Sequence, residues 1–152
     1  MDAKHLRTLE LDKVLARLAT LASFSASHEL LLELQPETTL ARVRAAQAAT
    51  GEAVRLLAGH PSLSIGAAHD IRPLVERAKL GAVLQPPDFL EVHGTIESAR
   101  AMREVLHRGQ LVYPELATYA GRLHPLRGLH DEIATTINEH GEVVDSASPQ
   151  LT

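Results

Sequence analysis

The chain has 152 residues, of which 45% are hydrophobic and 22% charged, and its formal net charge is −4 at pH 7. This composition is typical of a globular domain and excludes a chain that is disordered throughout. The absence of cysteine excludes disulfides, thiolate nucleophiles and cysteine-ligated zinc. No apolar run reaches the roughly 18 residues of a membrane span, and the charged N-terminus does not resemble a signal peptide. We therefore expect a cytoplasmic protein with no membrane partner.

Hydrophobic residues recur at helical spacing along most of the chain, between short loops rich in Gly, Pro and Ser. The expected helices cover residues 3–21, 27–35, 39–57, 70–80, 88–107, 114–123 and 125–138. Near 139–145, Gly141 and Val143-Val144 predict at most a short extended or hairpin piece. The sequence thus predicts an all-α fold, a bundle of about seven helices with short loops. Residues 1–145 are expected to form one helical core-like domain, and 146–152 to start a further, truncated helix.

The apolar stripes of these helices predict which side chains are buried. The predicted positions are Leu11, Leu15, Leu18 and Leu21; Leu40, Val43, Gln47 or Ala46, Thr50, Val54 and Leu57; Leu74, Val75 and Ala78; Phe89, Val92, Ile96, Ala99, Met102 and Leu106; and Leu126, Leu129, Ile133 and Ile137. Two glycines, Gly51 and Gly94, stand inside predicted helices, where glycine costs roughly 1 kcal/mol relative to alanine.

Nine histidines raise the question of a metal site. His93 and His107 lie fourteen residues apart on one predicted helix, about 21 Å at 1.5 Å per residue, which is too far to share an ion. His130-Asp131-Glu132 lacks the second histidine of a His-Glu-x-x-His motif. We therefore expect solvated or capping histidines and no metal ligands.

The sequence shows no constellation for catalysis. It contains no Gly-x-Ser-x-Gly nucleophile elbow, no phosphate-binding P-loop and no Gly-x-Gly-x-x-Gly. Carboxylate pairs fall in an acidic stretch without Lys or Arg, 131–145, which is typical of a solvated face. We expect no catalytic, cofactor-binding or metal-binding residues in this chain.

A local excess of arginine on and beyond the longest predicted helix marks candidate contacts with phosphates or a partner. These candidates are Arg100, Arg103 and Arg108, of which the first two share a helix face. Arg72 is a fourth candidate, because it follows His69-Asp70-Ile71, but it could equally be an internal salt-bridge partner.

Four blocks, in order along the chain, resemble the MutS-two family, bacterial paralogues of the mismatch-repair protein MutS. They are LRTLELDKVL at 6–15 with ASFS at 22–25, LQPET at 34–38, HDIRP at 69–73 and GEVVDSASPQL at 141–151. The resemblance covers essentially the whole chain. It departs from the family at Ser27-His28, where glycine and a basic residue are usual.

The resemblance implies that this is the helical N-terminal domain of a longer protein. That protein is expected to carry a lever and clamp, a P-loop ATPase using ATP and a divalent metal, and an Smr nuclease domain, all outside this sequence. It is expected to bind and nick branched DNA, to suppress homologous recombination, to recognise collided ribosomes and to form a homodimer. The domain itself is expected to be non-catalytic and to transmit the ATPase state to the clamp through packed helices.

Two other interpretations remain open from the residues alone. The first is a stand-alone helical protein-interaction or dimerisation module. The second is a small helical hydrolase with a histidine site, which ranks last because no nucleophile, base and orienting group can be assembled from the sequence.

Overall fold

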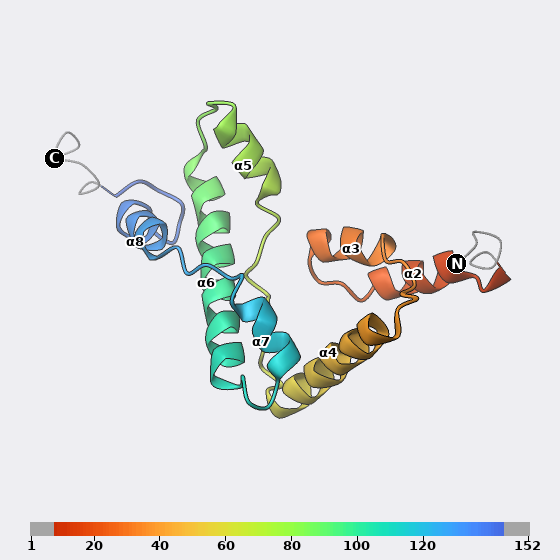
Figure 1. Ribbon diagram of the computed structural model, residues 1–152. Helices are drawn as coiled ribbons and strands as arrows, with labels where there is room; N and C mark the ends of the chain where they lie inside the picture. Colours follow the sequence, from red (N-terminus) through yellow and green to blue (C-terminus); the bar gives the residue numbers. More distant parts are fainter. Residues whose placement is uncertain (1–7, 145–152) are drawn as a thin grey trace. The chain divides into compact units, whose positions relative to one another are not determined.

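The computed structural model describes residues 8–144, which form seven α-helices and no β-sheet (Figure 1). The predicted all-α fold is confirmed. Cα packing divides the chain into two compact units, Met1–Pro61 and Ser62–Thr152. The helix predicted to begin at 146 lies outside the described residues. Among the helices described, none combines the length and hydrophobicity that a bilayer span requires.

The first unit contains α2 (Leu11–Ala19), α3 (Ser25–Leu32) and α4 (Leu40–Gly59). Helices α2 and α3 pack against each other across the turn at 20–24, and Ala19 is buried there. The prediction that Leu18 and Leu21 are buried is wrong, because both are exposed. The apolar stripe of α2 extends beyond the surface that α3 covers.

The predicted buried face of α4 is also wrong. Leu40, Val54 and Leu57 are more than half exposed, whereas Leu56 and the charged Glu52 are buried. Leu, Val and Ala occur all around this helix, so its periodicity does not single out one face. Which face is buried therefore depends on the tertiary environment of the helix.

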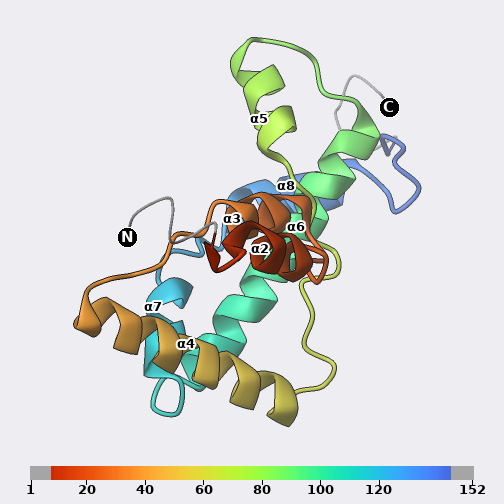
Figure 2. The same cartoon turned by 90° about the vertical axis from the view of Figure 1, so that its right-hand side faces the viewer.

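The second unit is built around its longest helix. It contains α5 (Arg72–Lys79), α6 (Pro86–Arg108), α7 (Pro114–Ala120) and α8 (Arg127–Thr136). Both α7 and α8 pack on α6, and α5 lies beside the first turns of α6 in both views (Figures 1 and 2). The core of this unit comprises Leu74, Ile96, Leu106, Ala120, Ile133 and Ile137. The predictions for Val75 and Ala78 are wrong, since both are exposed and only Leu74 of α5 is buried.

Helix α6 begins two residues before the predicted Asp88. Pro86 and Pro87 occupy its first turn, where the missing N–H groups of proline are not needed. The N-cap Gln85 and Asp88 form a capping box, in which Asp88 Oδ2 accepts the Gln85 N–H at 2.8 Å. Arg77 of α5 contacts the same carboxylate at 3.2 Å. These bonds fix both the start of α6 and its junction with α5.

Helix α8 starts at Arg127, after the predicted Pro125, because Leu126 takes a left-handed conformation (φ 41°) and becomes the N-cap. The predicted burial of Leu126 and Leu129 is wrong for the same segment, since both are exposed. After the helix, Gly141 turns the chain at φ 75° and Ile137 pairs with Val143 in an antiparallel bridge. The short hairpin piece predicted near 139–145 is thus present.

Candidate functional site

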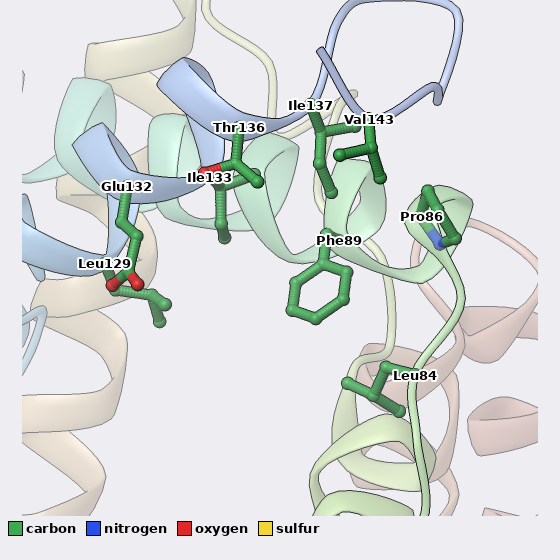
Figure 3. A pocket seen from close by; sticks show the side chains of 9 residues that line it. All are labelled: Leu84, Pro86, Phe89, Leu129, Glu132, Ile133, Thr136, Ile137 and Val143. Atoms are coloured by element: carbon green, nitrogen blue, oxygen red, sulfur yellow. The ribbon is translucent and has the colours of Figure 1, made fainter. Parts of the chain in front are cut away.

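An apolar pocket of about 330 Å³ lies in the second unit, between the start of α6, helix α8 and the short hairpin. Its lining consists of Leu84, Pro86, Phe89, Leu129, Glu132, Ile133, Thr136, Ile137 and Val143. Figure 3 shows the Phe89 ring in the middle of these side chains. Among the described residues that line it, Glu132 and Thr136 are the polar ones. The pocket therefore suits an apolar side chain of another protein element and offers no nucleophile paired with a base.

Two features of the sequence position this pocket. The capping box at Gln85 and Asp88 fixes the first turn of α6, which carries Phe89. The bridge between Ile137 and Val143 folds the hairpin back over α8. Backbone bonds reinforce it, since Val144 N donates to Thr136 O at 2.9 Å and Asn138 N donates to Glu142 O at 2.9 Å. The sequence predicted Phe89 and Ile133 as core residues, but the hollow they help line appears only when α8 packs on α6.

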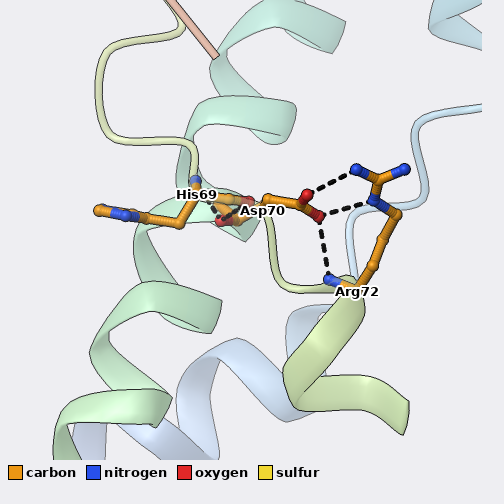
Figure 4. A network of polar contacts seen from close by, with 4 residues as sticks. His69, Asp70 and Arg72 are labelled. Carbon is orange, nitrogen blue, oxygen red and sulfur yellow. Dashed lines mark hydrogen bonds and ion pairs between the residues drawn. The ribbon is translucent and has the colours of Figure 1, made fainter. Parts of the chain in front are cut away.

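The block His69-Asp70-Ile71-Arg72 forms a polar network at the start of α5 (Figure 4). Arg72 donates from Nε to Asp70 Oδ1 at 2.7 Å and from Nη2 to Asp70 Oδ2 at 2.6 Å. Asp70 Oδ1 also accepts the backbone N–H of Arg72 at 3.2 Å. The two-pronged pair matches the internal salt-bridge alternative for Arg72.

The other three candidate arginines all lie on α6 but differ in their surroundings. Arg108 forms an ion pair with Glu104, one turn earlier. Arg100 is half-buried, and its positive charge acts on Asp131 of α8. Arg103 is exposed and makes no ion pair within residues 8–144. The structure thus places these arginines on one helix and leaves Arg103 as the candidate best presented to a polyanion.

Three residues that could hold a metal ion come together on α6 and α8. His93 and Glu97 lie one turn apart on α6, His130 lies on α8, and their ligand atoms are all within 4.8 Å of one another. The imidazole rings of His93 and His130 stack with centroids 4.4 Å apart. The expectation of solvated or capping histidines is wrong for this pair, because their Nε2 atoms are buried and have no hydrogen-bond partner within residues 8–144.

Sequence reasoning missed this cluster because it compared histidines on one helix. The available signal was His93-x-x-x-Glu97, which puts both side chains on one face. The third member, His130, stands 37 positions after His93, and no local pattern connects them.

His130 is also tied to its neighbour Asp131. The distance between His130 Nδ1 and Asp131 Oδ1 is 2.9 Å. The pKa of the Asp131 carboxyl is lowered, chiefly because of this hydrogen bond, and the charges of His130, Arg100 and Arg127 act in the same direction. The carboxylate therefore stays ionised beside the imidazole at neutral pH.

The chain is similar over 99% of its length to several bacterial proteins named Endonuclease MutS2. It is 39% identical over 151 residues to that of Symbiobacterium thermophilum and 36% identical over 154 residues to that of Thermomicrobium roseum. It is 31% identical over 154 residues to that of Acetivibrio thermocellus. The chain spans only 19% of the length of each of these relatives. No family model matches the chain.

Proposed function

Because this chain corresponds to the N-terminal region of MutS2 proteins, we propose that it is a non-catalytic helical domain that couples the other domains of such a protein. The single observation that carries this function is the pocket on α6 and α8, whose lining is almost entirely apolar. An apolar pocket on a helical scaffold is a docking site for another element of the same large protein. Such a docking site can transmit a conformational change only if its two walls are held rigidly. The packing of α8 on α6 holds them in this way.

The longer protein would be an ATP-dependent nuclease that acts on branched DNA and suppresses recombination. ATP, a divalent metal and the nuclease centre would be held by other domains of a homodimer. In this arrangement the domain supplies a rigid connection and, through Arg103 and its neighbours on α6, contacts to phosphate. The names of the relatives support the nuclease, and the exposed Arg103 supports the contact.

The test places a charge in the pocket of a full-length MutS2 protein. Leu129 lines the pocket and is 43% exposed, so Leu129→Glu introduces a carboxylate without disturbing the core. Leu111 is 93% exposed and lies outside the pocket, so Leu111→Glu is the matched control. We expect Leu129→Glu to abolish the effect of ATP on the affinity for a four-way junction, and Leu111→Glu to leave it unchanged. An unchanged ATP response in both variants would contradict the coupling role.

Collided ribosomes are the other ligand that the family resemblance suggests. The same two variants, sedimented with stalled disomes, separate the two ligands. If Leu129→Glu reduced binding to disomes but left the ATP response of junction binding unchanged, the ribosome would replace DNA as the ligand in this proposal.

A stand-alone interaction or dimerisation module is the second candidate. The observation that favours it is the number of large apolar side chains on the surface, with Leu80 and Leu111 each more than four-fifths exposed. A stable dimer of the isolated chain that DNA does not affect would support this candidate over the coupling domain.

A further inference from the structure

His93, Glu97 and His130 bring three metal-ligating side chains within reach of one ion. Ligands at 2.0–2.2 Å around a tetrahedral ion lie roughly 3.3 Å from one another. In the structure His130 Nε2 lies 3.6 Å from Glu97 Oε1, and all three ligand atoms fall within 4.8 Å. The two imidazole rings stack with their planes 23° apart, so the rings must turn about their side-chain torsions before both Nε2 lone pairs point at one ion.

Each of the two imidazoles has a buried nitrogen that makes no hydrogen bond to the described residues. His93 Nε2 and His130 Nε2 are buried and have no hydrogen-bond partner among the described residues. A buried polar atom without a hydrogen-bond partner destabilises the folded protein. A cation bound by all three groups would give both nitrogens a partner.

Asp131 orients His130 for this role. With its proton on Nδ1, 2.9 Å from the Asp131 carboxylate, His130 presents a bare Nε2 to Glu97 and His93. A carboxylate behind a ligating histidine is the usual outer partner in protein metal sites, because it fixes both the tautomer and the ring orientation. The Glu97 side chain is 60% exposed while that of His130 is 14% exposed, so an ion can enter from the solvent side.

We propose that His93, Glu97 and His130 form a binding site for a divalent transition-metal ion of the zinc class. Two imidazoles and one carboxylate are the donors that zinc and its neighbours select, whereas calcium and magnesium require oxygen ligands throughout. Three protein ligands leave a fourth position open to water or to a donor from outside.

The ion would fasten α8 to α6. Two of its ligands belong to α6 and one to α8, so each bound ion adds a cross-link between these helices. His93 also lines a second cavity of about 410 Å³ together with Ile133, Ile137 and Asn138. The cross-link would hold the α8 wall of both cavities in place.

The test begins with zinc titrated into the purified, chelator-treated protein by calorimetry. We expect one ion per chain, and a rise in melting temperature of about 4 °C or more at saturating zinc. Cobalt in place of zinc should give the visible absorption of a four-coordinate ion with nitrogen and oxygen ligands. Glu97→Gln keeps the shape of an exposed side chain, so it tests the site without risk to the fold. It should lower the affinity for zinc at least about tenfold, and Asp131→Asn should lower that affinity by roughly tenfold.

Two variants on the same helix provide the controls. His107→Gln and Glu91→Gln remove exposed side chains of the same two types outside the cluster, and both should bind zinc as the parent does. His130→Gln should abolish stoichiometric binding, with circular dichroism confirming that the helices remain. The proposal is overturned if the protein binds no zinc, or if zinc affinity is unchanged by both Glu97→Gln and His130→Gln. Either result would leave the coupling role of the apolar pocket untouched.

Discussion

Gly94 in the middle of α6 lies directly against the carbonyl oxygen of Ala67, so that a Cβ at position 94 would come within 2.8 Å of that oxygen. One residue later, the Thr95 hydroxyl accepts the backbone N–H of His69 at 2.9 Å. These contacts hold residues 67–69 against α6. His69 directly precedes Asp70, whose carboxylate pairs with Arg72, and all three residues belong to one of the blocks that carry the family resemblance.

Gly94→Ala should destabilise the protein by about 1–2 kcal/mol, because the clash with the Ala67 backbone outweighs the higher helix propensity of alanine. Gly51→Ala is the matched control in α4. The nearest atom to its new Cβ is Arg55 Nη1 at 3.5 Å, the end of a flexible side chain. This control should stabilise the protein by up to about 1 kcal/mol. Urea unfolding measures both, and equal effects of the two substitutions would contradict the close approach.

Thr95→Val should lower stability by about 1 kcal/mol, because valine has the shape of threonine but cannot accept the His69 N–H. Thr95→Ser keeps the hydroxyl and should cost less. Hydrogen exchange offers a local measurement, in which the His69 amide should exchange faster in the valine variant. An unchanged exchange rate at His69 would show that the segment is held by other contacts.

Asp70 both pairs with the Arg72 guanidinium and accepts the Arg72 backbone N–H at the start of α5. Asp70→Asn keeps an acceptor and loses the charge, so it should cost less than about 1 kcal/mol at this partly exposed pair. Asp70→Ala loses both interactions and should cost about 1–2 kcal/mol. Thermal unfolding of the two variants compares these contributions. If the alanine variant were as stable as the asparagine variant, the hydrogen bond from the Arg72 backbone N–H would contribute nothing to stability.

Arg103→Glu, made in the full-length protein, should weaken binding to a four-way junction roughly three- to tenfold and lower the salt slope by about 1. Arg44→Glu is the control, because Arg44 is also exposed but lies on α4, outside the α6 arginines. Arg108 should respond less than Arg103, since its guanidinium is paired with Glu104. Fluorescence anisotropy at several salt concentrations measures these effects. Identical affinities and slopes in the parent and the Arg103 variant would remove this position from the interface.

The all-α fold and the order of the helices follow from the local sequence. Pro114 is expected in the first turn of a helix and Gly141 at a turn, and both stand there, because these residues act through their own backbone conformation. Pro86 and Pro87 are expected in a loop but form the first turn of α6. The blocks that resemble MutS-two proteins are likewise a property of the sequence, and the similarity of the whole chain to MutS2 relatives confirms them.

The faces that those helices bury, and the distant side chains that meet, follow from how the helices pack. The periodicity of α4 allowed several faces, and the structure buries Glu52 and Leu56. In the sequence, Gly94 is a residue of low helix propensity inside a helix. In the structure, the Ala67 carbonyl oxygen lies against it and leaves no room for a Cβ. His93, Glu97 and His130 come together because α8 packs across α6. Local sequence governs backbone conformation over a few residues, whereas these relationships depend on how separate helices pack in three dimensions.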